Sequence, residues 1–131
     1  MSGYWKQPET TQQTLNNGWL RTGDLGRKDE EGFIYLVDRT KDVIISGGFN
    51  IYPKEVENVL QSHPAVSNSA VIGAPDEKWG ERVVAFVVWK SGKTGTRDDL
   101  VELVRDEKGP IQAPKEIHFV NELPLTSLGK I

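Results

Sequence analysis

The chain has 131 residues, of which 37% are hydrophobic and 27% are charged, and its formal net charge is −3. The length and composition fit one ordinary globular domain with room for an appendage. The slight acidity makes nucleic acid a poor candidate partner. The sequence has no cysteine, which excludes disulfides, thiolate metal sites and a cysteine nucleophile. No apolar run approaches the ~20 residues of a membrane helix and the start resembles no signal peptide, so we expect a cytoplasmic protein without a transmembrane segment.

The first 40 residues contain few structure-forming patterns. The segment PETTQQTL (residues 8–15) predicts a short helix, because proline is tolerated in a first helical turn. The residues that follow are predicted to be irregular, and TGDLG places Asp24 in a turn between glycines. The aromatic and aliphatic run in GFIYLVDR (residues 32–39) predicts a strand that a DEEG turn precedes.

The patterns become clear from residue 42 onward. DVIISGGFNIYP predicts a hairpin that turns at Gly47–Gly48. The later predictions are, in chain order, a helix over 52–63, strands over 66–75 and 81–90, a helix over 96–109 with capping-box spacing, and a short strand over 116–120. The second of these strands is apolar enough to be central. The order predicts an α+β domain, in which helices pack on a small mixed β-sheet with a β-hairpin.

Four segments hold candidate functional residues, although each also has a plain structural interpretation. They are TGDLG with Asp24, DRTKD with Arg39 and Lys41, SGGFN with Ser46, Gly47 and Gly48, and the terminal LTSLGK with Lys130. Taken singly, they are typical of a common turn, a solvated charge cluster, a tight glycine turn and a frayed terminus.

Two other candidate sites, a phosphate-binding loop and a histidine metal site, lack the residue spacing that their chemistry requires. SGKTG ends like a phosphate-binding loop, but Val87 stands where that pattern needs a glycine, so a plain turn is favoured. His63 and His118 lack metal-ligand spacing, and we predict no metal site in the chain.

Five segments, read together and in order, carry a resemblance that no single one of them would support. They are GYWKQPETT, GWLRTGDLG, VDRTKDVIISGGFNIYPKEVE, GAPDEKWGERVVAFVV and LPLTSLGKI, and they extend over essentially the whole chain. They closely resemble the C-terminal part of acyl- and aryl-CoA synthetases, which belong to the adenylate-forming superfamily with luciferases and peptide-synthetase adenylation domains. The resemblance implies that a carboxylic acid reacts with ATP, in the presence of Mg²⁺, to give an acyl-adenylate and pyrophosphate. The acyl group then passes to the thiol of CoA and AMP leaves.

The resemblance also implies roles for three residues at the nucleotide. Asp24 corresponds to the aspartate that binds the ribose hydroxyls, and a carboxylate can accept from both of them. Arg39 corresponds to an arginine that contacts the same nucleotide through its fork of donors. Lys130 corresponds to the catalytic lysine of adenylate formation, whose ammonium reaches the substrate carboxylate and the α-phosphate.

Other matched positions concern movement and the second half-reaction. In this family a small C-terminal domain rotates against a large N-terminal domain between the two half-reactions, and Lys41 corresponds to the hinge. Ser46, Gly47 and Gly48 correspond to the loop that approaches the pantetheine arm of CoA, where glycine allows close backbone approach.

We therefore expect residues 1–40 to be the end of the large N-terminal domain with the hinge region, and residues 41–131 to be the mobile C-terminal domain. The ATP phosphate loop, the Mg²⁺ ligands and the acyl pocket would lie in the large domain, so these 131 residues alone are expected to be inactive. The SGGFNIYP version of the glycine turn favours a fatty, medium-chain or aromatic acid as substrate. One alternative is an adenylation domain that loads a carrier protein. The other is a non-catalytic interaction module, which would not need Asp24, Arg39 and Lys130 together.

Overall fold

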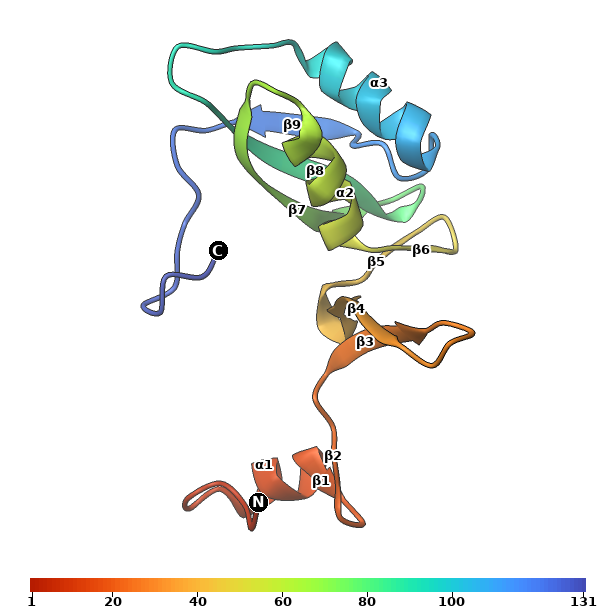
Figure 1. The fold of residues 1–131 in the computed structure, drawn as a ribbon, viewed down its shortest axis with the longest axis vertical. Coiled ribbons are helices and arrows are strands. Elements are labelled where there is room, and N and C mark those ends of the chain that lie inside the picture. The colour runs from red at the N-terminus through yellow and green to blue at the C-terminus, as the bar shows by residue number, and fades with distance from the viewer. The chain divides into compact units, whose positions relative to one another are not determined.

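The computed structural model describes residues 1–131, and these divide into two compact units, Met1–Lys41 and Asp42–Ile131 (Figure 1). The division falls within η1 (Thr40–Asp42), a single turn of 3-10 helix. No helix in either unit has the length and apolar character that crossing a membrane requires.

The first unit begins with the predicted helix and continues with strands that the sequence patterns did not predict. Helix α1 (Pro8–Thr14) has proline in its first turn. Strands β1 (Leu15–Asn16) and β2 (Trp19–Leu20) form a hairpin over a region predicted to be irregular. The turn residues Asn17 and Gly18 have φ of 50° and 83°, as a two-residue hairpin turn requires.

A second hairpin of the first unit joins β3 (Asp24–Lys28) to β4 (Ile34–Arg39). The prediction of a strand in GFIYLVDR is confirmed, but Asp24 is the first residue of a strand and does not lie in a turn. The hairpin turn is closed by Asp29, whose Oδ1 accepts the Phe33 N–H at 2.9 Å. The pairing slips by one residue between Leu25 and Gly26, which marks a β-bulge.

The second unit is the predicted α+β domain. Its elements are β5 (Ile44–Ser46), β6 (Phe49–Ile51), α2 (Pro53–Ser62), β7 (Val66–Asp76), β8 (Gly80–Trp89), α3 (Arg97–Lys108) and β9 (Glu116–Phe119). The sheet runs in the order β6-β5-β8-β7, and β9 pairs with β8 in parallel while the other pairs are antiparallel. The sheet is therefore mixed, and the predictions of the hairpin, both helices and a central β8 are confirmed.

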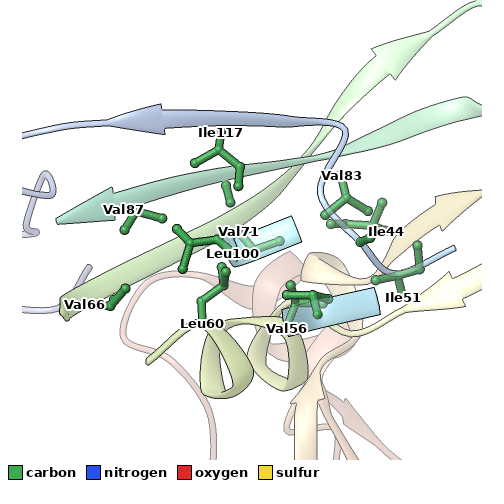
Figure 2. Packing of buried hydrophobic residues seen from close by; sticks show 13 residues of the cluster. Ile44, Ile51, Val56, Leu60, Val66, Val71, Val83, Val87, Leu100 and Ile117 are labelled. Atoms are coloured by element: carbon green, nitrogen blue, oxygen red, sulfur yellow. The ribbon is translucent and has the colours of Figure 1, made fainter. Parts of the chain in front are cut away.

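Helices α2 and α3 pack on one face of this sheet and enclose the core with it (Figure 2). Helix α3 begins as its sequence predicts, since the Thr96 hydroxyl accepts the Asp99 N–H at 3.2 Å in a capping box. Alternate residues of the strands point toward the helices, so Val71 and Ala85 lie opposite each other beneath them. The core consists of Ile44, Ile51, Val56, Leu60, Val66, Val71, Val83, Ala85, Val87, Leu100, Val104, Ala113 and Ile117.

Strand β7 forms an edge of the sheet, because it pairs only with β8. Side-chain oxygens accept hydrogen bonds from two of the backbone N–H groups that point away from β8. The Glu57 carboxylate of α2 accepts the Val71 N–H at 3.0 Å, and the Asn68 side-chain oxygen accepts the Ser69 N–H at 2.9 Å. Gln61, also from α2, donates to the Asn68 side-chain oxygen at 3.2 Å.

Neighbouring isoleucines on β5 provide a matched test of the core assignment. Ile44 is 1% exposed and Ile45 is 56% exposed, because successive strand residues point to opposite faces. We expect Ile44→Val to lower the free energy of unfolding by about 0.5–1.5 kcal/mol. The control Ile45→Val should change it by less than about 0.5 kcal/mol. Urea unfolding followed by circular dichroism measures both, and equal losses would contradict the placement of Ile44 in the core.

Candidate functional site

The two residues matched to nucleotide contacts in the first unit are brought together by strand pairing. Asp24 and Arg39 lie directly opposite each other on β3 and β4, so their side chains are neighbours on one face of the hairpin. Both residues are exposed. The Thr40 N–H donates to the Gly23 carbonyl at 2.8 Å and closes this end of the hairpin. No ion pair joins the two side chains, so a carboxylate and a guanidinium stand side by side and face solvent.

Lys41 lies in η1 and is the last residue of the first unit. Its side chain is exposed. A residue in this position connects the two units without belonging to either core, so a change in its backbone angles would disturb little packing.

Ser46 is the last residue of β5, and Gly47 and Gly48 form the turn to β6, where the hairpin was predicted. Gly47 and Gly48 have φ of 57° and 82°, in the left-handed region that favours glycine. A Cβ atom added at Gly47 would lie 2.9 Å from Cε3 of Trp79, whereas one added at Gly48 would meet nothing within 4 Å. The turn thus packs its first glycine against an indole ring and leaves the second open.

Lys130 lies in a short terminal turn that Thr126 closes. The Thr126 N–H donates to the Lys130 carbonyl at 2.6 Å, and the Lys130 N–H donates to the Thr126 hydroxyl at 3.2 Å. The Gly129 N–H also donates to the Thr126 carbonyl, at 2.9 Å. The backbone at Lys130 is therefore hydrogen-bonded locally, while its exposed side chain forms no ion pair.

The candidate residues are thus divided between the units. Asp24, Arg39 and Lys41 belong to the first, and Ser46, Gly47, Gly48 and Lys130 belong to the second. Within the second unit no hydrogen bond joins the turn at Lys130 to the glycine turn. Sequence reasoning missed Glu81, whose Oε2 accepts the Ile45 N–H at 2.7 Å next to the glycine turn.

A charged network lies on the sheet face opposite the helices. The Arg82 Nε–H donates to Glu116 Oε2 at 3.2 Å, and His118 Nε2 lies 2.7 Å from Glu116 Oε1. The hydrogen bond from Arg82, and then that from His118, lower the pKa of Glu116 below its usual value. The His118 ring also stacks on Phe86 with the ring centroids 5.2 Å apart. Glu116 and His118 thus make hydrogen-bonding and ring-stacking contacts on this face of the sheet.

The fold is that of a known family. The family model "AMP-binding enzyme C-terminal domain" matches residues 55–130. The chain belongs to this family, which confirms the resemblance to adenylate-forming enzymes.

Individual relatives extend the likeness beyond the matched range. The chain is 50% identical to a medium/long-chain-fatty-acid–CoA ligase, FadD8 of Mycobacterium tuberculosis, over 98% of this chain and 24% of the relative. The structure of the amide bond synthetase McbA from Marinactinospora thermotolerans is 47% identical, with a TM-score of 0.93 over 99% of this chain and 27% of that one. The o-succinylbenzoate CoA synthetase MenE from Bacillus subtilis, in complex with its acyl-adenylate intermediate, is 40% identical with a TM-score of 0.94. This likeness extends over 100% of this chain and 27% of the MenE chain. The chain spans about a quarter of the length of these relatives.

Proposed function

We propose that this chain is the C-terminal part of an ATP-dependent carboxylic acid–CoA ligase. The observation that carries the proposal is the 50% identity to a fatty-acid–CoA ligase over 98% of the chain. In the first half-reaction a carboxylate oxygen of the acid attacks the α-phosphorus of ATP, and pyrophosphate leaves. In the second, the sulfur of CoA attacks the acyl carbon, the thiol proton is lost and AMP leaves. The acid is of the fatty, medium-chain or aromatic class.

The first unit would hold the nucleotide through its strand pair. Asp24 accepts hydrogen bonds from the ribose hydroxyls, and Arg39 donates to ribose or phosphate oxygens. Their direct opposition on β3 and β4 supports this assignment, because it presents an acceptor and a donor to one ligand. Mg²⁺ accompanies the ATP phosphates. The chain contains no group of three or more His, Asp or Glu side chains that could hold a metal ion, so we assign the Mg²⁺ contacts to the nucleotide and to the remainder of the protein.

Residues of the second unit would act on the acyl group. Lys130 places its ammonium at the carboxylate and the α-phosphate, where negative charge builds as pyrophosphate leaves. Ser46, Gly47 and Gly48 line the approach of the pantetheine arm, and the open space beside Gly48 suits a narrow ligand. Lys41 acts as the hinge, since the boundary between the two units falls there.

A second candidate has the same first half-reaction and a different acceptor. The 47% identity to an amide bond synthetase favours an enzyme that passes the acyl group from the adenylate to an amine nitrogen. The third possibility, transfer to a carrier protein, would also begin with the adenylate. All three share the proposed roles of Asp24, Arg39 and Lys130, and they differ in what approaches the glycine turn.

The test is an assay of the whole protein that contains this chain. It should release pyrophosphate from ATP and Mg²⁺ when a fatty, medium-chain or aromatic acid is added, and form a thioester when CoA follows. Adenylate formation with an amine product and no thioester would favour the second candidate. Absence of acid-dependent pyrophosphate release across a broad panel of acids would refute adenylate formation. The 131 residues alone should be inactive in the same assay.

A further inference from the structure

The hairpin β5–β6 is supported differently at its two ends. At the end away from the turn, Ile44 and Ile51 lie opposite each other and are 1% and 0% exposed in the core. At the turn, Gly47 and Gly48 are exposed and Phe49 is 56% exposed. Burial therefore fixes the base of the hairpin, whereas the turn is held by its packing against Trp79 and by polar contacts.

Three contacts attach this end of the hairpin to Trp79, which precedes β8, and to Gly80 and Glu81, the first residues of β8. Ser46 forms with Gly80 the single residue pair between β5 and β8. The Gly47 N–H donates to the Trp79 carbonyl at 2.8 Å, and the Ile45 N–H donates to Glu81 Oε2 at 2.7 Å. The contact to Glu81 is the one that a side chain makes, so a point mutation can remove it while the two backbone contacts stay possible.

The Glu81 carboxylate is itself confined. A Cβ atom added at Gly73 would lie 2.8 Å from Glu81 Oε1 and 3.2 Å from Cγ1 of Ile44. The carboxylate thus occupies space that the missing side chain of Gly73 leaves open, beside a buried isoleucine. One oxygen lies in this space, and the other accepts the hydrogen bond from the hairpin. An ionised acceptor makes a shorter and roughly twice stronger hydrogen bond than a neutral one.

We propose that Glu81 is a positioning residue that holds the Gly47–Gly48 turn in place for the thioester-forming half-reaction. This inference rests on the proposed function, in which the turn lines the approach of CoA. Glu81 acts through the Ile45 N–H and need not touch any substrate. Its loss should loosen the turn and weaken the use of CoA, while adenylate formation proceeds as before.

The experiment compares Glu81→Ala, Glu81→Gln and the matched control Glu77→Ala in the whole protein that contains this chain. Glu77 lies nearby in the connection between β7 and β8, is exposed, and its side chain forms no hydrogen bond or ion pair. Hydrogen-exchange mass spectrometry reports on the amides of residues 44–50. We expect exchange about 10-fold or more faster in Glu81→Ala, a few-fold faster in Glu81→Gln, and unchanged in Glu77→Ala.

The half-reactions supply a readout that a general loss of stability would not give. Glu81→Ala should raise the KM for CoA by about 10-fold, while acid-dependent pyrophosphate release stays within about twofold of the wild type. Glu81→Gln should remove most of this rise in the KM for CoA, because the amide oxygen of glutamine can still accept the hydrogen bond from the Ile45 N–H. If Glu81→Ala does not fold, the comparison of Glu81→Gln with Glu77→Ala decides the question.

Unchanged exchange at residues 44–50 in both Glu81 variants would overturn the positioning role. Equal losses in the two half-reactions would overturn it too. A wild-type protein that forms adenylate but no thioester would instead contradict the ligase proposal. The exchange comparison would then still decide whether Glu81 holds the turn, so the two failures are distinguishable.

Discussion

Replacing Lys130 with alanine should slow acyl-adenylate formation by about 10²–10³-fold in the whole protein, the cost typical of removing one preorganised charge contact from a transition state. Thioester formation from supplied acyl-adenylate should be largely spared, because the proposed rotation at Lys41 presents the Gly47–Gly48 turn in place of Lys130 in that half-reaction. The Lys130 side chain is exposed and forms no ion pair. Its loss therefore leaves no buried partner unsatisfied, and the variant should fold normally.

The two half-reactions are measured separately, by pyrophosphate release and by CoA-dependent loss of added acyl-adenylate. Leu128→Ala is the matched control, since Leu128 lies in the same turn and is 84% exposed. It should leave adenylate formation within about twofold, as expected of a surface change away from special features. Loss of both half-reactions to the same extent in Lys130→Ala would argue against a role confined to the first.

Gly47→Ala should lower the free energy of unfolding by about 2–5 kcal/mol, from two sources. A residue with a Cβ at φ of 57° adopts the left-handed conformation at a cost of about 1–2 kcal/mol. The new methyl group would also lie 2.9 Å from the Trp79 ring, and overpacking of this kind costs about 1–3 kcal/mol. Urea unfolding gives the total.

Gly48→Ala separates the two sources. Gly48 has a similar φ of 82°, but a Cβ there meets nothing within 4 Å. Its substitution should therefore cost only the conformational part, about 1–2 kcal/mol. Equal destabilisation by the two variants would mean that the indole contact contributes nothing. In the whole protein, Gly47→Ala should also slow thioester formation more than adenylate formation, because it displaces the turn against Trp79.

The second unit was predictable because several local signals agree along it. Helix α3 has a capping box at Thr96 and apolar residues at helical spacing. Helix α2 has proline at its start and ends before Pro64. Strand β8 is a long apolar run, and it lies in the middle of the sheet. Propensity, periodicity and turn chemistry all favour the same elements there.

The first unit was harder to predict, for two physical reasons. Strands β1 and β2 have two residues each, too short to show alternation, although the Asn17–Gly18 pair is a hairpin signal that the interpretation as irregular chain overlooked. Strand β3 is polar and contains Gly26 at a bulge, so it has neither the composition nor the period of a half-buried strand. The pairing of β3 with β4 therefore could not be deduced from the sequence, and neither could the position of Asp24 opposite Arg39.

Candidate residues could be selected from the sequence where the side chain itself would carry the chemistry. A residue whose side chain holds the backbone of another segment could not be selected in this way. Asp24, Arg39 and Lys130 stand in recognisable motifs, and their assigned roles stay proposals. Glu81 bonds a main-chain N–H that lies 36 residues away in the sequence. A backbone donor has no residue identity, so no spacing rule connects the two, and only the folded hairpin reveals the contact.

The covered N–H groups at the edge of β7 have a consequence for the second unit in the proposed ligase, in which it would change position between the half-reactions. A domain that changes its position relative to a larger one must spend time with its surfaces in water, and an open strand edge would then template pairing with a second copy. Glu57 and Asn68 accept the Val71 and Ser69 N–H groups that such a copy would use. At these two positions the second unit carries its own protection against edge-to-edge pairing, and in the proposed ligase this protection would not depend on contact with a larger domain.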